Sequence, residues 1–197
     1  MILAERLCLF GFDPHSGRTR ETPSKTALNG VVAALLLADL LHAGRYATSA
    51  GGWRECDHLP MAHPLLDEAA SRLSTATPED PVAAWQRLQH MAPAAWRRLH
   101  RALAERDVLE LQVPFPFVRR YRLRSRMAWN DAVGMLRTQD AGERLRRVAL
   151  VLAAQRCGWL ADLVDADAAR AALIEAHEAS LGDDAVATVA RLLAAQR

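Results

Sequence analysis

The feature that most constrains the fold is the apolar segment VVAALLLADLLHAGR at residues 31–45. A transmembrane helix needs about 20 consecutive apolar residues, whereas this run extends at most from Leu28 to Ala43 before Gly44 ends it. At about 1.5 Å per residue it predicts a helix roughly 24 Å long, too short for a membrane span. A helix that is apolar on nearly every side must be surrounded by other elements, so we expect Val32 to Leu41 at the centre of the core.

The remaining sequence argues for a cytoplasmic protein without a metal or other cofactor. The opening MILAERLCLFGF carries Glu5 and Arg6 within its apolar run and has no small-residue cleavage pattern, unlike a secretory signal. The three cysteines, Cys8, Cys56 and Cys157, are far apart and show no CxxC spacing, which favours reduced thiols over disulfides or a zinc site.

Helical spacing of leucine and alanine dominates the chain and predicts a mainly α protein, with residues 1–197 forming one globular domain around the apolar helix. Prolines mark the start of several helices, as expected at the first helical position. The predicted helices are Ile2–Phe10, Leu28–Ala43, His63–Leu73, Pro81–Met91, Pro93–Arg106 and a helical region from Met127 onward with breaks near Gly142, Gly158 and Gly182. Two short hairpins are predicted at residues 45–57 and 108–124.

The second hairpin allows its register to be predicted. A five-residue turn, PFPFV, places Leu111 opposite Tyr121 and Leu109 opposite Leu123 on one face. The other face then pairs Gln112 with Arg120 and Glu110 with Arg122. One face is thus apolar and the other charged, as a half-buried hairpin requires. A four-residue turn would mix the two faces, so we reject it.

Two polar clusters raise the question of catalysis or metal binding. Asp39 and His42 share a helix face, and either can pair with the other or with Arg45; a structural ion pair is the preferred interpretation. The segment CDHLPMAHP, residues 56–64, contains cysteine and histidine but none of the standard zinc spacings. We interpret it as the exit from the first hairpin.

The basic residues are better organised than these clusters. The chain has 25 lysines and arginines, of which only Lys25 is a lysine. Arg97 and Arg101 share a helix face with Arg98 beside them. Arg120, Arg122, Arg124 and Arg126 alternate as one face of a strand does. A solvated face is the plain interpretation, and an anionic surface or ligand is the functional one, because guanidinium groups bind phosphate well. No nucleic-acid module accompanies the charge.

The order of motifs resembles the Golgi phosphoprotein 3 family from the first residues to about Val164. The motifs are LFGFD, SGR, ADLLHAGR, HPLLDEAA, ALAERDVLE, the second hairpin and ALVLAAQRCGWLADLV. The short segment between the second hairpin and the late leucine-rich helix resembles the compact bacterial-type members. Asp39 matches a carboxylate that members carry before their GR, which favours a structural role for it.

The resemblance implies a mostly helical, non-enzymatic fold. Eukaryotic members bind phosphatidylinositol 4-phosphate at the Golgi membrane and retain glycosyltransferases as adaptors. The family's lipid-binding positions fall on Ser24, Ala33, Pro93 and Trp96 here, and none of the four matches. The residues nearby that can replace them as a lipid or anion site are Arg18, Arg20, Lys25, Arg97, Arg98 and Arg101.

The family also uses the second hairpin for self-association and membrane attachment. Its predicted tip presents Phe115 and Phe117, with Arg119, Arg120 and Arg122 beside them, an arrangement that suits an anionic membrane interface. A tip packed on its own domain is the alternative. We therefore expect a homo-oligomer through this hairpin.

These observations lead to one functional hypothesis and two rivals. The first is a non-catalytic protein, peripheral on the inner face of the membrane, that recognises anionic, phosphoinositide-like headgroups and holds a protein partner there. The second is an enzyme or small-ligand-binding protein recruited to a bacterial biosynthetic pathway. The third is an oligomeric scaffold without ligand. An apolar pocket with a few convergent polar groups favours the second, and a basic face with exposed aromatic residues favours the first.

Overall fold

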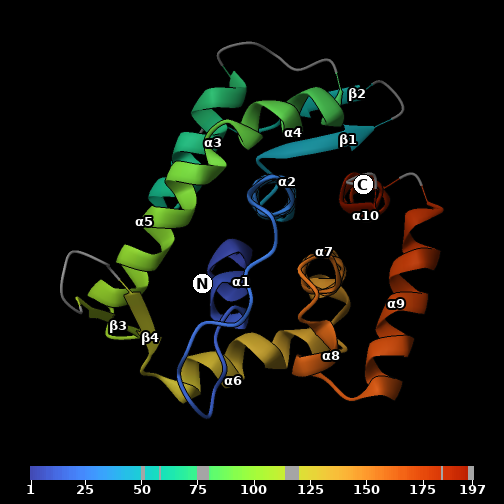
Figure 1. Ribbon diagram of the computed structural model, residues 1–197. Helices are drawn as coiled ribbons and strands as arrows, with labels where there is room; N and C mark the ends of the chain where they lie inside the picture. The colour runs from blue at the N-terminus through green and yellow to red at the C-terminus, as the bar shows by residue number, and fades with distance from the viewer. Residues whose placement is uncertain (50–51, 58, 75–79, 114–119, 183, 195–197) are drawn as a thin grey trace.

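Helix α2, Lys25–His42, runs through the centre of the computed structural model, and other helices are arranged around it (Figure 1). Every residue from Val31 to Leu41 is buried, which confirms the predicted core helix. The helix begins one turn earlier than predicted, at a cap in which the Ser24 hydroxyl accepts a hydrogen bond from the Ala27 N–H at 3.2 Å. The structure describes residues 1–49, 52–57, 59–74, 80–113, 120–182 and 184–194.

By length and composition alone, α2 could also cross a membrane. However, 72% of its 18-residue apolar window is buried inside the protein. Its neighbours include α4, α7 and α10, and the last two lie nearly parallel to it in the view of Figure 1. We therefore assign α2 as the core helix of a mainly helical domain.

The described residues contain ten α-helices, two short 3-10 helices and two hairpins. This confirms the predicted mainly α fold class. The helices are α1 Leu3–Phe10, α2, α3 Pro64–Ser74, α4 Pro81–Gln89, α5 Ala92–Glu105, α6 Arg126–Gly134, η1 Met135–Arg137, η2 Ala141–Glu143, α7 Arg144–Arg156, α8 Leu160–Leu163, α9 Ala166–Ser180 and α10 Ala185–Ala194. The breaks near Gly142, Gly158 and Gly182 are confirmed, and Gly158 ends the turn after α7 with a φ of 74°.

The first hairpin consists of β1, Tyr46–Ser49, and β2, Gly52–Glu55, paired antiparallel. The Tyr46 ring stacks on Trp53 with centroids 4.9 Å apart. Its hydroxyl donates a hydrogen bond to the Ala70 carbonyl of α3 at 3.2 Å. These contacts fasten the hairpin to the helical body.

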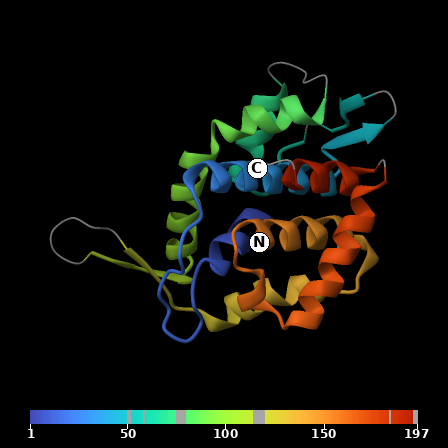
Figure 2. The ribbon, with the colours of Figure 1, turned by 45° about the vertical axis from the view of Figure 1, so that its right-hand side comes forward.

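The second hairpin, β3 Leu109–Gln112 and β4 Arg120–Leu123, has the predicted register at all four pairs. Its base is buried through Leu109 and Leu123, but Leu111 remains 43% exposed. The expected apolar face is therefore covered only at the base. The reason is visible in Figure 2, where the hairpin extends away from the helices.

Candidate functional site

Asp39 is structural, but its partners are not the ones that sequence spacing suggested. Its carboxylate accepts a hydrogen bond from the Leu3 N–H at 2.7 Å and pairs with Arg146 of α7 at 3.3 Å. His42 is exposed, and Arg45 pairs with Glu55 instead. Burial raises the pKa of Asp39 to about 6, while the two hydrogen bonds counteract that rise. The Asp39 carboxylate therefore links α1, α2 and α7 inside the protein. The predicted pairing with His42 or Arg45 is wrong.

A second buried carboxylate, Glu5 of α1, was not singled out by sequence reasoning. It pairs with Arg106 and lies 3.2 Å from the His63 Nε2 atom. Burial opposes its ionisation, but the hydrogen bonds and charges of His63 and Arg106 lower its pKa below the ordinary value. His63, in the segment CDHLPMAHP, therefore helps to hold α1 in place. Cys56 of the same segment is exposed, and the described residues contain no group of three potential metal ligands.

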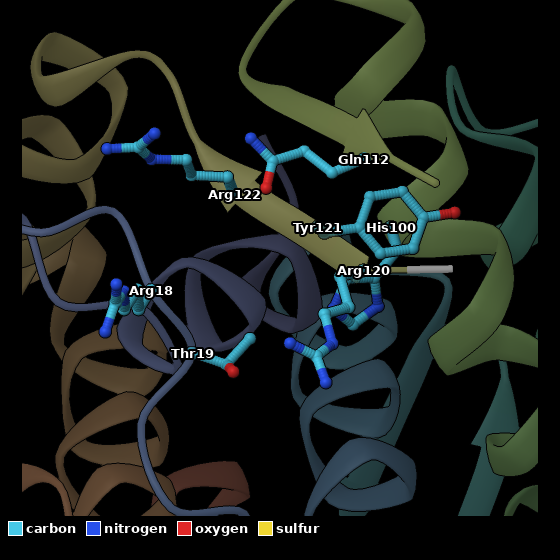
Figure 3. Close-up of a pocket in the computed structure, with 7 residues that line it drawn as sticks. All are labelled: Arg18, Thr19, His100, Gln112, Arg120, Tyr121 and Arg122. Carbon is cyan, nitrogen blue, oxygen red and sulfur yellow. The ribbon is translucent and has the colours of Figure 1, made fainter. Parts of the chain in front are cut away.

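The most distinctive polar feature is a cleft of about 820 Å³ between the N-terminal loop, α5 and the second hairpin (Figure 3). We call it the arginine cleft. Its lining residues are Arg18, Thr19, His100, Gln112, Arg120, Tyr121 and Arg122. None of these is acidic, and its three arginines form no ion pair with any described residue. In Figure 3 the Arg120 guanidinium lies across the cleft from those of Arg18 and Arg122. The charged side chains that line the cleft are therefore all positive, which suits an anionic ligand.

The loop before α2 places Arg18 in this cleft. Asp13 accepts hydrogen bonds from the Ser16 N–H at 2.6 Å and the His15 N–H at 3.1 Å, which closes a turn. Gly17 follows with a φ of 70°, a conformation that glycine tolerates best. Its carbonyl accepts a hydrogen bond from the Leu123 N–H of β4 at 2.9 Å. The turn therefore fixes the SGR segment against the hairpin.

Gly17 is also required by the space available. A Cβ atom there would lie 3.0 Å from the Arg122 side chain and 3.0 Å from the Leu123 carbonyl oxygen. The close approach of loop and strand brings Arg18 and Arg122 to one cleft, although 104 positions separate them in sequence, the difference of their residue numbers. The SGR motif was noted in the sequence, but its contact with the hairpin was not predictable from it.

Among the described residues that line the arginine cleft, His100 is the only histidine. Its Nδ1 atom is 2.9 Å from the Trp96 carbonyl one turn earlier. Its ring contacts those of Phe12, Trp96 and Tyr121 at centroid distances of 6.1, 5.0 and 4.9 Å. Burial lowers its pKa, against the effect of the Trp96 hydrogen bond. Sequence reasoning missed His100 because it lies between two surface arginines on an amphipathic helix.

The other predicted anion-binding residues do not all join the cleft. Arg20 pairs with Asp162 and also donates to the Phe12 carbonyl. Arg98 pairs with Glu68 of α3. Lys25, at the start of α2, is exposed. Arg97 and Arg101 are exposed on α5 and have no ion pair within the described part of the chain. The cluster predicted from sequence is therefore split, and only Arg18 of that set lines the cleft.

The predicted row of alternating arginines is split as well. Arg120 and Arg122 line the arginine cleft, whereas Arg124 pairs with Asp107 at 2.8 Å. Arg126 is the first residue of α6 and lines a neighbouring hollow of about 520 Å³. The strand ends at Leu123, so the alternation does not continue beyond it. The tip residues Phe115, Phe117 and Arg119 lie outside the described residues.

Two other hollows bear on the alternative functions. The 520 Å³ hollow includes Asp13 and Asp162 as well as Arg20 and Arg126, so its charges are mixed. An apolar hollow of about 660 Å³ lies on α8 and α9, with Leu173 and Ile174 among its lining residues. Neither hollow is lined by a residue of the core helix α2. Of these hollows, only the arginine cleft is lined by several cationic side chains without an acidic one, so it is the best-supported candidate site.

Comparison with known protein families shows that the sequence model of the Golgi phosphoprotein 3 (GPP34) family matches residues 3–195. No curated protein matches the chain.

Proposed function

We propose that this chain, which belongs to the Golgi phosphoprotein 3 family, is a non-catalytic peripheral membrane protein. It binds anionic lipid headgroups through the arginine cleft. The family is known for peripheral Golgi association through phosphatidylinositol 4-phosphate. The short segment after the second hairpin supports a compact bacterial-type member.

The observation that carries the proposal is the accumulation of unpaired cations. Arg18, Arg120 and Arg122 line one cleft whose described lining contains no acidic residue, and Glu110, opposite Arg122 in the hairpin, forms no ion pair with it. Elsewhere in the described chain, Arg98, Arg106 and several other arginines pair with carboxylates. A guanidinium group without a carboxylate partner is available to form charge-assisted, often paired hydrogen bonds to phosphate. Three at one cleft favour a phosphate-bearing ligand.

The family's own lipid-binding positions explain why the cleft is the better candidate. Ala33, which falls on one of these positions, is fully buried in α2 and cannot reach a headgroup. Trp96, on another, packs edge-on against His100 of the arginine cleft, at 5.0 Å between ring centroids. The chain thus supports a shifted site beside one family position, with arginines supplied by the loop and the hairpin.

The position of the cleft supports an orientation on a membrane. The hairpin extends away from the helical body (Figure 2). Towards its tip two described residues are apolar and exposed: Leu111 of β3 is 43% exposed, and Val113, just after β3, is 62% exposed. Arginine and apolar side chains at one projecting element suit the interface, where apolar groups enter and guanidinium groups stay at headgroup level. We propose that Phe115, Phe117 and Arg119 contribute to membrane attachment or self-association.

Arg97 and Arg101 extend the positive surface along α5, and Arg20, Lys25 and Arg98 contribute at most long-range attraction. Exposed charges of this kind attract an anionic bilayer but are screened within about 10 Å at moderate salt. We therefore expect the cleft to determine which headgroup binds. The surrounding arginines would mainly raise the local concentration of protein at the membrane.

Vesicle flotation tests this proposal. We expect the wild type to bind phosphatidylcholine vesicles that contain phosphatidylglycerol or phosphatidylinositol 4-phosphate, and not phosphatidylcholine alone. Replacing Arg18, Arg120 and Arg122 with glutamine should abolish most of the binding. The matched control replaces the exposed Arg87, Arg170 and Arg191 with glutamine, which removes the same charge from other faces.

Equal loss in both triple variants would show that net charge alone is responsible and would refute a defined site. A wild type that ignores acidic vesicles at low salt would refute membrane association altogether. Binding of soluble organic phosphates without binding to vesicles would favour the rival function, a small-ligand-binding protein that uses the same cleft.

A further inference from the structure

The single imidazole of the arginine cleft has no assigned role in the proposed headgroup site. His100 lies on α5, and its ring is enclosed by aromatic neighbours from three segments of the chain: Phe12 after α1, Trp96 one turn earlier and Tyr121 of β4. It also lines the cleft that holds Arg18, Arg120 and Arg122.

The hydrogen bond to Trp96 determines where the ring can accept a proton. The Trp96 carbonyl is an acceptor, so Nδ1, 2.9 Å away, must carry the hydrogen. The remaining nitrogen, Nε2, is therefore the acceptor in the neutral ring, and it has no hydrogen bond to any described residue. Protonation of His100 must occur at this atom.

We infer that His100 is a ligand-binding residue of the arginine cleft, and that binding of an anion there is accompanied by protonation of its Nε2 atom. This inference rests on the proposed function. In the step, a proton from solvent forms an N–H bond at Nε2, and the neutral imidazole becomes an imidazolium. The new N–H donates to the bound anion and adds a fourth positive group to the cleft.

Burial lowers the pKa of His100 and so favours the neutral ring. An anion among the three arginines changes this balance, since a nearby opposite charge favours the charged form of a histidine. The same linkage requires that anion binding strengthens as the pH falls, because protonation and anion binding favour each other.

The other groups of the arginine cleft leave this effect to the ring itself. Those that line it are the guanidinium groups of Arg18 on the loop and of Arg120 and Arg122 on β4, the Tyr121 phenol and the Gln112 amide, and Glu110 lies opposite Arg122 in the hairpin. On its own helix, Arg97 and Arg101 flank it on the exposed side. Histidine is the only one of these side-chain types that ordinarily titrates between about pH 5 and 8.

The test uses a ligand whose own charge is constant over this range. Phosphatidylglycerol is a phosphodiester, whereas a phosphate monoester changes charge near about pH 6. Binding of the wild-type protein to phosphatidylglycerol vesicles is compared at about pH 5.5 and about pH 7.5 with that of His100→Asn. Asparagine can still donate to the Trp96 carbonyl but does not titrate. His177→Asn, an exposed helical histidine on α9, is the control.

We expect the wild type and His177→Asn to bind about threefold more tightly at the lower pH, as one added charge close to the anion implies. His100→Asn should bind almost equally at the two values. The same pH dependence in His100→Asn as in the wild type would overturn the inference while leaving the proposed function intact. A wild type that binds equally at both values would do the same. Failure of the wild type to bind at either pH would refute the proposed function, and this inference with it.

Discussion

The buried carboxylate of Asp39 makes a defined prediction about stability and pH. Burial raises its pKa in the folded protein to about 6, whereas an aspartate in an unfolded chain titrates near about 3.9. The folded state therefore binds the proton more readily. The stabilisation that results is fully present below about pH 4 and is lost as the pH rises through about 6. The two pKa values differ by about 2, which corresponds to about 3 kcal/mol over the full range.

Only part of this range is accessible without disturbing other groups. The pKa of Glu5 is lowered in the folded protein, so its stabilising contribution is lost in more acidic solution. Between about pH 7 and about pH 5, the Asp39 carboxyl should add about 1 kcal/mol to the free energy of unfolding. Asp39→Asn retains an oxygen that can accept from the Leu3 N–H but cannot titrate, so it should lack this gain.

Urea denaturation at the two pH values measures the difference directly. The informative quantity is the change in the free energy of unfolding with pH, compared between the wild type and Asp39→Asn. Asp57→Asn, at an exposed carboxylate, serves as the control and should behave as the wild type. If Asp39→Asn keeps the wild-type gain at lower pH, the buried carboxyl is not its source, and burial does not raise the pKa of Asp39 as we describe.

Three further predictions concern the cleft and the core. Gly17→Ala should lower the free energy of unfolding by about 1–2 kcal/mol, because alanine disfavours this backbone conformation. It should also weaken vesicle binding, because the new Cβ displaces Arg122. Urea denaturation measures the first effect and vesicle flotation the second. Replacing Arg97 and Arg101 with glutamine should reduce vesicle binding only at low salt, and a loss that persists at about 0.5 M salt would contradict a screening role. Leu35→Ala, at a fully buried site of α2, should cost about 2–5 kcal/mol in urea denaturation, and a cost below about 1 kcal/mol would argue against a central position.

Local sequence patterns were sufficient to predict the helices and the two hairpins. The apolar run predicted the central position of α2 because no other environment hides every side of such a helix. The register of the second hairpin followed because one shifted residue would have mixed Leu111 with Arg120 across the strands. Both results depend on residues close together in sequence. The full length of α2 was underestimated because the first turn, which begins after the Ser24 cap, is polar.

Long-range contacts were not predictable in the same way. Asp39 was expected to pair within its own helix end, but the folded chain brings Arg146 to it from α7. Arg18 was one of several arginines in a polar loop. The contact between Gly17 and β4 places Arg18 in the cleft, whereas Arg20 pairs with Asp162. His100 gave no signal, because its role depends on Trp96, Phe12 and the hairpin meeting around it. The choice among similar arginines is therefore determined by tertiary packing.

The most direct test of a defined anion site is to observe the arginines themselves. Arginine Nε–H signals of the wild-type protein can be followed by NMR during titration with a soluble short-chain phosphatidylglycerol. We predict that the signals of Arg18, Arg120 and Arg122 shift together with a single dissociation constant, while that of the paired Arg98 stays unchanged. Saturable binding that shifts other arginines and leaves these three unaffected would contradict the arginine cleft as the headgroup site.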